Sequence, residues 1–246
     1  LYEKALKGRR NNRVQEAQIY NNMAAIYYHR AAYKLAAKYW LKSLQTQPEV
    51  PELRYRLALA LIRNGNLDAA AQNLQMVISN QSDYVDAIRL QAIVYLMEND
   101  DASALPLLRK ALKLRPQDVV NLVNLAAYYQ RNAQPRKAIV FLREAIKMKP
   151  DDPTVLTWLI IVNTDMERTN AVTAYRKKLL RTLPVENLLL KLNRWRQEPI
   201  CQDRMICPPI DDRLMQLLKA HTKETFETFL KPTVDDHQHL QSKTAF

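Results

Sequence analysis

Cys201 and Cys207 are the residues of this chain whose type and spacing most directly suggest chemistry. They are the only two cysteines, and five residues separate them in a proline-flanked stretch. An oxidising compartment would favour a small disulfide loop, whereas a reducing one would keep two thiols. Zinc sites usually take ligands two to four residues apart and in sets of four. The pattern therefore favours ordinary thiols, with a disulfide as the alternative; a metal site completed by His237 and His239 is the least favoured interpretation.

The other reactive residues do not form a recognisable catalytic set. The chain has four histidines, three of them after residue 200, and a nucleophile with its base and orienting group is recognised by geometry rather than by sequence order. Only two glycines occur, Gly8 and Gly65, so a glycine-rich loop that cradles phosphate cannot be built. Gly65 follows an asparagine and precedes another, which is typical of a turn between helices. We therefore predict that this chain is not an enzyme and needs no cofactor or metal.

The elements that position all side chains are indicated by a repeat. A helix-stopping residue recurs every 34 residues, at Pro48, Ser82, Pro116, Pro150 and Pro184, which predicts one supersecondary unit copied in tandem. When the proline is counted as position 32, small residues recur where helices would cross closely: position 8 holds Ala24, Ala58, Ala92, Ala126 and Ile160, and position 20 holds Ala36, Ala70, Ala104, Ala138 and Val172. Large apolar residues recur at positions 11 and 24, where the space between helices must be filled.

This pattern resembles the tetratricopeptide repeat family over roughly Ala17 to Pro184. The sequence departs from the family's pattern at Arg54, Ser82, Gln91, Asn163 and Arg176. A helical-repeat family that reads RNA base by base has a period one residue longer, and the constant 34-residue step argues against it. The resemblance implies an all-α fold: a right-handed α-solenoid of helix-turn-helix repeats with C-terminal capping helices.

The resemblance also implies a division of the chain. Residues 1–16 would be the remnant of a preceding repeat and a lead-in, 185–197 a capping helix, and 198–246 a loop, an additional helix and a disordered tail. Between these flanks we expect five repeats, at 17–50, 51–84, 85–118, 119–152 and 153–184. The capping helix is also indicated by apolar residues at spacings of three and four, namely Leu188, Leu189, Leu192 and Trp195.

The start of the chain bears on its compartment. Leu1 begins a stretch that reads as the end of a repeat helix, so we expect an upstream segment holding further repeats, a signal peptide or a membrane anchor. No run of about eighteen apolar residues predicts a membrane span in the given residues, so we expect this part to be soluble. The compartment stays open between the cytoplasm and the periplasm.

In the tetratricopeptide family the first helix of each unit lines a concave groove, chiefly through positions 2, 5, 6, 9, 12 and 13. Carried over onto this sequence, these positions imply a protein-binding groove lined by Asn21, Asn22, Tyr28, Tyr55, Arg56, Arg63, Arg89, Ile93, Met97, Asn124, Arg131 and Trp158. A partner segment with aliphatic and acidic residues would suit it, because Arg56, Arg89 and Arg131 can bind carboxylates through two parallel hydrogen bonds. The alternative is that the chain's own C-terminal helix, or a second copy in a homo-oligomer, covers this groove.

The net charge of +12 is unevenly distributed. By the same resemblance the outer, convex side would carry the second helices and a basic surface made of Arg109, Lys110, Lys113, Arg136, Lys137, Arg143, Lys147, Lys177 and Lys178. The simplest interpretation is a solvated face whose lysine and arginine side chains interact favourably with the helix dipole near helix C-termini. The alternatives are attraction to an acidic protein or an anionic membrane surface, and, least favoured, to nucleic acid.

We therefore predict a non-catalytic protein–protein interaction scaffold that binds a partner segment in its groove within a multiprotein assembly. Bacterial relatives of this kind commonly serve secretion, pilus or envelope-polysaccharide machines, so the resemblance implies such a setting. One alternative is a regulatory or substrate-recruiting module of a larger enzyme. A further alternative is a nucleic-acid adaptor that acts through the basic surface.

Overall fold

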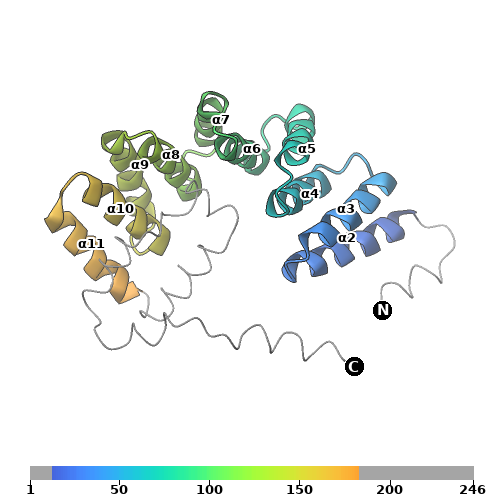
Figure 1. The fold of residues 1–246 in the computed structure, drawn as a ribbon, viewed down its shortest axis with the longest axis horizontal. Coiled ribbons are helices and arrows are strands. Elements are labelled where there is room, and N and C mark those ends of the chain that lie inside the picture. The colour runs from blue at the N-terminus through green and yellow to red at the C-terminus, as the bar shows by residue number, and fades with distance from the viewer. Residues whose placement is uncertain (1–12, 183–246) are drawn as a thin grey trace. The chain divides into compact units, whose positions relative to one another are not determined.

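The fold is known from a computed structural model that describes residues 13–182. This part is built from α-helices, each of which packs against the next one along the chain (Figure 1). The helices are α2 (Arg13–His29), α3 (Tyr33–Thr46), α4 (Pro51–Arg63), α5 (Leu67–Asn80), α6 (Val85–Met97), α7 (Asp101–Leu114), α8 (Val119–Arg131), α9 (Pro135–Met148), α10 (Pro153–Asp165) and α11 (Thr169–Thr182). The predicted class, an all-α solenoid of helical repeats, is confirmed.

Contacts are most extensive within five successive pairs, which are α2–α3, α4–α5, α6–α7, α8–α9 and α10–α11. The second helix of each pair packs in turn on the first helix of the next, and α10 also contacts α8. The chain divides into two compact units, residues 1–209 and 210–246, and all the described helices belong to the first. The division into repeats at the exact residues given above stays a prediction, and the lead-in, the capping helix and the C-terminal elements lie outside the described residues.

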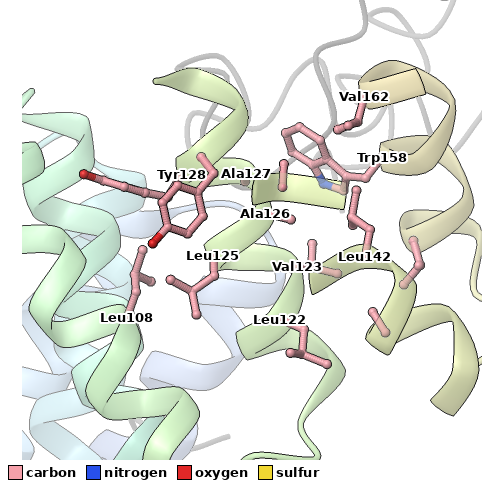
Figure 2. Close-up of a cluster of buried hydrophobic side chains, with 14 of the residues drawn as sticks. Leu108, Leu122, Val123, Leu125, Ala126, Ala127, Tyr128, Leu142, Trp158 and Val162 are labelled. Atoms are coloured by element: carbon pink, nitrogen blue, oxygen red, sulfur yellow. The ribbon is translucent and has the colours of Figure 1, made fainter. Parts of the chain in front are cut away.

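The small residues at positions 8 and 20 lie at the helix crossings. Eight alanines occupy these positions in the first four pairs, and all of them are completely buried: Ala24, Ala36, Ala58, Ala70, Ala92, Ala104, Ala126 and Ala138. Large side chains at position 24, such as Leu108 and Leu142, fill the space beside the crossings. Figure 2 shows this around α8, whose apolar side chains lie between Leu108 on one side and Leu142 and Trp158 on the other.

Two departures from the repeat pattern are accommodated locally. Asn163 replaces an apolar residue at position 11 of the last pair, and its buried Nδ2 donates a hydrogen bond of 2.7 Å to the carbonyl of Leu159 in its own helix. Arg54 replaces a large apolar residue on α4, and its Nη1 lies 3.3 Å from the sulfur of Met76. In the described part of the chain, no helix combines the length and the apolar character that a membrane crossing requires.

The turn inside each pair depends on one backbone conformation. A residue with positive φ recurs every 34 residues, at Ala31, Gly65, Asn99, Ala133 and Glu167, with φ between 52° and 78°. In two of these turns an N-cap side chain starts the next helix. The carboxamide oxygen of Asn66 and a carboxylate oxygen of Asp100 accept hydrogen bonds from backbone N–H groups of the first turn. Only Gly65 among the five is free of the Cβ that makes left-handed backbone unfavourable.

Replacing Ala133 by glycine therefore relieves a strained position. We expect Ala133→Gly to raise the free energy of unfolding by about 1 kcal/mol. Ala174→Gly, at an exposed site inside α11, is the matched control and should lower it by about 1 kcal/mol. Urea unfolding followed by circular dichroism measures both, and destabilisation of similar size by the two changes would contradict this account of the turn.

Candidate functional site

The candidate site is the set of side chains at positions 2, 5, 6, 9, 12 and 13 of the units that begin at residues 17, 51, 85, 119 and 153. We call it the first-helix face, because α2, α4, α6, α8 and α10 carry it. Of the twelve predicted groove residues, nine are exposed or half-buried: Asn21, Asn22, Tyr28, Tyr55, Arg56, Arg63, Arg89, Met97 and Arg131. The other three, Ile93, Asn124 and Trp158, are buried. The face is thus accessible on α2 and α4 and increasingly covered toward α10.

Aromatic side chains give the accessible part its character. The Tyr28 ring lies 5.3 Å from the ring of Tyr33 and 5.6 Å from that of Trp40, between ring centroids. The Tyr55 and Tyr84 rings form a second pair, 5.7 Å apart. These separations are those of favourable edge-on and tilted aromatic pairs. The result is a half-buried aromatic surface formed by Tyr28 on α2, Tyr33 at the start of α3, Tyr55 on α4 and Tyr84 before α6.

Hydrogen bonds and a cation hold this aromatic surface in place. The Trp40 Nε1 donates to the Asn21 Oδ1 at 2.9 Å, which links α3 to α2. The guanidinium of Arg63 lies 5.9 Å from the centroid of the Tyr33 ring, within the range of a cation–π interaction. The two contacts fix the orientation of the Asn21 and Arg63 side chains, which lie on the first-helix face.

The three arginines that were predicted to bind a partner's carboxylates have carboxylate or carbonyl partners within the chain. The Arg56 Nε donates to Glu52 at 2.7 Å, one turn earlier on α4. Arg89 forms ion pairs with Asp86 and, at 3.1 Å, with Asp118. A partner carboxylate at these positions would have to replace an internal one, so the open part of the face attracts ligands less by charge than the sequence suggested.

Two of these arginines connect successive repeats. Arg89 on α6 reaches Asp118, whose Oδ1 also caps α8 by accepting from the Val120 N–H at 2.8 Å. Arg131 on α8 reaches back to the end of α6, where its Nη1 donates to the carbonyl of Leu96 at 2.8 Å. The predicted binding cations therefore contribute to the stacking of the third helix pair on the fourth.

Burial raises the pKa values of the tyrosines on this surface. It is the main cause for Tyr28, Tyr55 and Tyr84. The pKa of Tyr84 is raised further because its hydroxyl donates a hydrogen bond to Glu52, and the charge of Asp86 raises that of Tyr55. All three hydroxyl groups therefore stay protonated, and able to donate, well above neutral pH.

The covered part of the face, on α8 and α10, is different in chemistry. Val123, Ala127 and Thr157 are buried beside Asn124 and Trp158. Figure 2 shows the Trp158 indole of α10 next to Ala126 and Ala127 of α8. These two small residues leave room for the large ring. Neither amide atom of Asn124 has a hydrogen-bond partner, and the Nε1 of Trp158 has none either. These are unusual groups to leave unpaired in a protein interior.

The predicted basic surface lies on α7, α9 and α11, and most of its side chains are exposed. Several have partners: Lys147 pairs with Glu144 at 2.7 Å, and Lys178 with Asp151 at 3.5 Å. Within residues 13–182, histidine, cysteine and carboxylate side chains form no group of three or more that would hold a metal ion. Cys201 and Cys207 lie outside the described residues, as do His237 and His239.

Sequence reasoning did not include Tyr33, Tyr84 or Asp118 in the site. Tyr33 and Tyr84 lie where α3 and α6 begin, and not at the first-helix positions that the family pattern names. Asp118 is the N-cap residue of α8, a position that the family's groove pattern does not include. Tyr84 and Asp118 both stand at position 34, directly before a first helix, so the register of the repeat offered a signal for these two, whereas Tyr33 has none.

Comparisons with known proteins agree with this architecture. A family model described as tetratricopeptide repeat matches residues 30–84 and 55–119. A human protein, protein O-mannosyl-transferase TMTC1, is 28% identical over 103 residues, which are 42% of this chain but only 12% of the length of that protein. The chain therefore spans a small fraction of the curated relative that it matches.

Solved structures are similar in fold. The thermophilic TPR protein TTC0263 of Thermus thermophilus is 21% identical, with a TM-score of 0.60, over 72% of this chain and 96% of that one. A MamA structure that begins at residue 41, from Desulfovibrio magneticus RS-1, is 19% identical, with a TM-score of 0.56, over 74% of this chain and 98% of that one. At these identities the likeness establishes the fold and leaves the function to the site.

The link between Arg89 and Asp118 should be measurable as stability. We expect Arg89→Met to lower the free energy of unfolding by about 2 kcal/mol, because it removes charged hydrogen bonds from two partly buried carboxylates. In a double-mutant cycle, Asp118→Asn keeps an N-cap residue and removes the charge. The loss in the free energy of unfolding that Asp118→Asn causes should therefore be smaller in the Arg89→Met background than in the wild type. Arg136→Met, at an exposed site of the basic surface, is the control. Strictly additive effects would show that the pair contributes nothing.

The raised tyrosine pKa values predict a loss of stability at high pH. Unfolded tyrosines ionise near pH 10, whereas Tyr28, Tyr55 and Tyr84 hold their protons in the folded state, so the free energy of unfolding falls as the pH rises above about 10. Tyr84→Phe removes one of these groups. Between pH 8 and pH 11, the free energy of unfolding of this variant should therefore fall less than that of the wild type. Urea unfolding at the two pH values measures the difference, and an equal fall would contradict the assignment.

Proposed function

We propose that this chain, which the tetratricopeptide repeat model matches over residues 30–84 and 55–119, is a scaffold that binds a segment of a partner protein on the accessible part of its first-helix face. Proteins with this repeat fold are typically non-catalytic and bind protein or peptide partners. The observation that supports the proposal most is the half-buried aromatic surface of Tyr28, Tyr33, Tyr55 and Tyr84. Aromatic rings with a polar edge are favoured at protein interfaces, because one end packs and the other forms hydrogen bonds.

The charges around this surface indicate what kind of segment suits it. Arg56 and Arg89 are paired within the chain, so a strongly acidic segment gains little. The exposed amide of Asn22 and the hydroxyl groups of the tyrosines both donate and accept hydrogen bonds. We therefore favour a segment with aliphatic or aromatic side chains, whose backbone pairs with these groups, over the acidic segment that the arginines alone suggested.

The setting of the scaffold stays a proposal. A multiprotein assembly, such as a bacterial secretion, pilus or envelope-polysaccharide machine, agrees with a chain that offers binding surfaces and no recognised catalytic set. The basic surface is a second candidate contact for an acidic protein or an anionic membrane. Lys147 and Lys178 of the basic surface are paired with carboxylates, which lowers the effective charge of this surface. We therefore favour the aromatic surface over the basic surface as the binding site.

A second candidate function is a substrate-recruiting or regulatory module of a larger enzyme. The similarity to a stretch of a protein named as an O-mannosyl-transferase favours it, because the matching 103 residues are a small part of that longer protein. Under this alternative, adding the chain to the enzyme would raise kcat/KM for a polypeptide acceptor and leave a short acceptor unchanged. No change for either acceptor would remove it.

Partner binding should depend on the first-helix face. After partners are captured from native lysate, overlapping peptides of a captured protein identify the bound segment, and calorimetry measures its affinity. We expect Asn22→Arg combined with Tyr55→Arg to weaken binding at least tenfold, because both place a charged, bulky group on the aromatic surface. Circular dichroism must show that the variant keeps its helical content.

The matched control places the same change on the second helices. Leu41→Arg with Val140→Arg alters exposed apolar residues of α3 and α9 and should leave the affinity unchanged. The opposite result, with loss of binding in the control and none in the first variant, would move the binding site to the second helices.

A further inference from the structure

The second helix of each pair has an outward face that its exposure defines. Positions 25 and 29 lie one turn apart on α3, α5, α7, α9 and α11, and their side chains are exposed in all five pairs. On the same helices the residue at position 20 is buried in every pair, as Ala104 is on α7. Since a solenoid repeats one packing arrangement, positions 25 and 29 face the same side in successive pairs.

The chemistry of this outward face changes after the second pair. In the first two pairs positions 25 and 29 hold neutral residues, Leu41 and Gln45 on α3 and Gln75 and Ser79 on α5. In the last three pairs both positions hold cations. We call these six residues the cation array: Arg109, Lys113, Arg143, Lys147, Lys177 and Arg181. The repeat thus places two rows of three cations on one side of α7, α9 and α11.

Neither packing nor the helix dipole accounts for the whole array. Leu41 and Gln75 occupy position 25 in pairs of the same architecture, so the fold does not require a cation there. Cations at position 29, such as Lys113, stand in the last turn of their helices and interact favourably with the dipole. Those at position 25, such as Arg109, precede that turn, and the dipole has little effect on them. The cations at position 25 are therefore available to an external anion.

Most of the charge of the array is not neutralised within the chain. Lys147 pairs with Glu144 at 2.7 Å, and the Arg109 Nη2 donates to the uncharged hydroxyl of Tyr129 at 3.2 Å. Among the residues that the structure describes, Lys147 is the one member of the array that forms an ion pair. Exposed charges of this kind attract an anionic surface over a distance of about 8 Å at physiological ionic strength.

Exposed aliphatic side chains lie among these cations. Val140, at position 22 of α9, is 55% exposed and shares a face with Arg143 and Lys147, three and seven residues further on. Leu114 and Met148, the last residues of α7 and α9, are each 40% exposed. Peripheral membrane contacts combine these two features, because aliphatic groups enter the headgroup region while cations bind anionic headgroups.

The form of the array favours a membrane over other polyanions. The cations spread over three helices, and the anionic headgroups of a fluid bilayer can move to each of them. Surfaces that bind single-stranded nucleic acid add exposed aromatic rings, whereas Phe141 and Tyr175, the aromatic residues of α9 and α11, are half-buried. An acidic protein would need carboxylates at fixed matching positions and would leave the exposure of Val140 without a role.

We propose that the outward face of α7, α9 and α11 binds the surface of a membrane that contains anionic lipids. The six cations attract the headgroups, and Val140 contacts the boundary of the acyl chains. This contact goes beyond the scaffold function and does not depend on it. The aromatic surface takes no residue from α7, α9 or α11, so one molecule can bind a partner segment and a membrane together.

Sedimentation of the full-length chain with lipid vesicles tests the contact without any partner protein. One set of vesicles is pure phosphatidylcholine, and the other is a two-to-one mixture of phosphatidylcholine and phosphatidylserine. We expect at least tenfold stronger binding to the mixed vesicles, and a loss of this binding as salt is added. The variant Arg109→Glu, Arg143→Glu and Lys177→Glu, which reverses the row at position 25, should bind the mixed vesicles at least tenfold more weakly than the wild type.

The matched control makes the same change in net charge on the first pair. Arg30→Glu, Lys34→Glu and Lys38→Glu alter exposed cations outside the array and should weaken binding less than threefold. Circular dichroism checks that both variants keep their helical content. An equal loss in the control would show that net charge alone is responsible and would overturn the proposal, as would unchanged binding of the array variant.

A fluorescent label on a chain with an intact array gives a second, independent test. In a background with Cys201→Ser and Cys207→Ser, an environment-sensitive dye is attached to Val140→Cys or, as the control, to Leu41→Cys on α3. Mixed vesicles should shift the emission at position 140 to shorter wavelength and leave that at position 41 unchanged. The absence of a shift at position 140 would overturn the proposal even where the array variant unfolds.

Other polyanions are tested on the same samples. Binding of duplex DNA or polyglutamate that depends on the array, with no binding to vesicles, would overturn the membrane contact and assign the array to nucleic acid or to an acidic protein. Because none of these measurements uses a partner segment, their failure would leave the proposed scaffold function intact. Loss of peptide binding on the first-helix face would in turn leave the membrane contact intact.

Discussion

The close crossing of two helices at a pair of alanines is the constraint on which the rest of this structure depends. In the fourth pair, for example, Ala126 and Ala138 are both completely buried where α8 and α9 meet. A larger residue at either position would force the helices apart, because protein interiors have no spare volume. The crossing also fixes the rotation of each helix about its axis, so the same positions point to the first-helix face in every pair. Repetition of one packing solution thus produces a continuous surface.

The chemistry of that surface is free to vary because packing does not depend on it. On α2 and α4 it is aromatic and accessible, as at Tyr28 and Tyr55. Around α6 and α8 it carries arginines that join one repeat to the next, and Arg89 is the clearest of them. On α10 it is covered around Trp158. One scaffold therefore presents three different regions: an accessible aromatic one, one whose arginines connect repeats, and a buried apolar one.

The fold followed from the sequence because its signal is repeated many times, whereas the state of the site depends on single contacts. The register of prolines and alanines predicted the helix pairs and which side chains would share a face. Of the five left-handed turn residues only Gly65 was evident, since Ala133 and Glu167 do not show by their type that the backbone is strained there. The internal pairing of Arg89 depends on where the turn before α8 places Asp118, which periodicity does not specify. The burial of Trp158 depends on the particular side chains packed around it, such as Ala127, and the repeat register alone does not specify these.

The most direct test of the central claim is a hydroxyl-radical footprint of the full-length chain with and without a bound partner segment. Oxidation of tyrosine side chains reports their contact with solvent, residue by residue. The account predicts that Tyr28 and Tyr55, both half-buried in the free chain, lose reactivity when the segment binds, while side chains on the second helices keep theirs. Unchanged oxidation of both tyrosines, with protection confined to α7, α9 and α11, would contradict it and identify the basic surface as the place of binding.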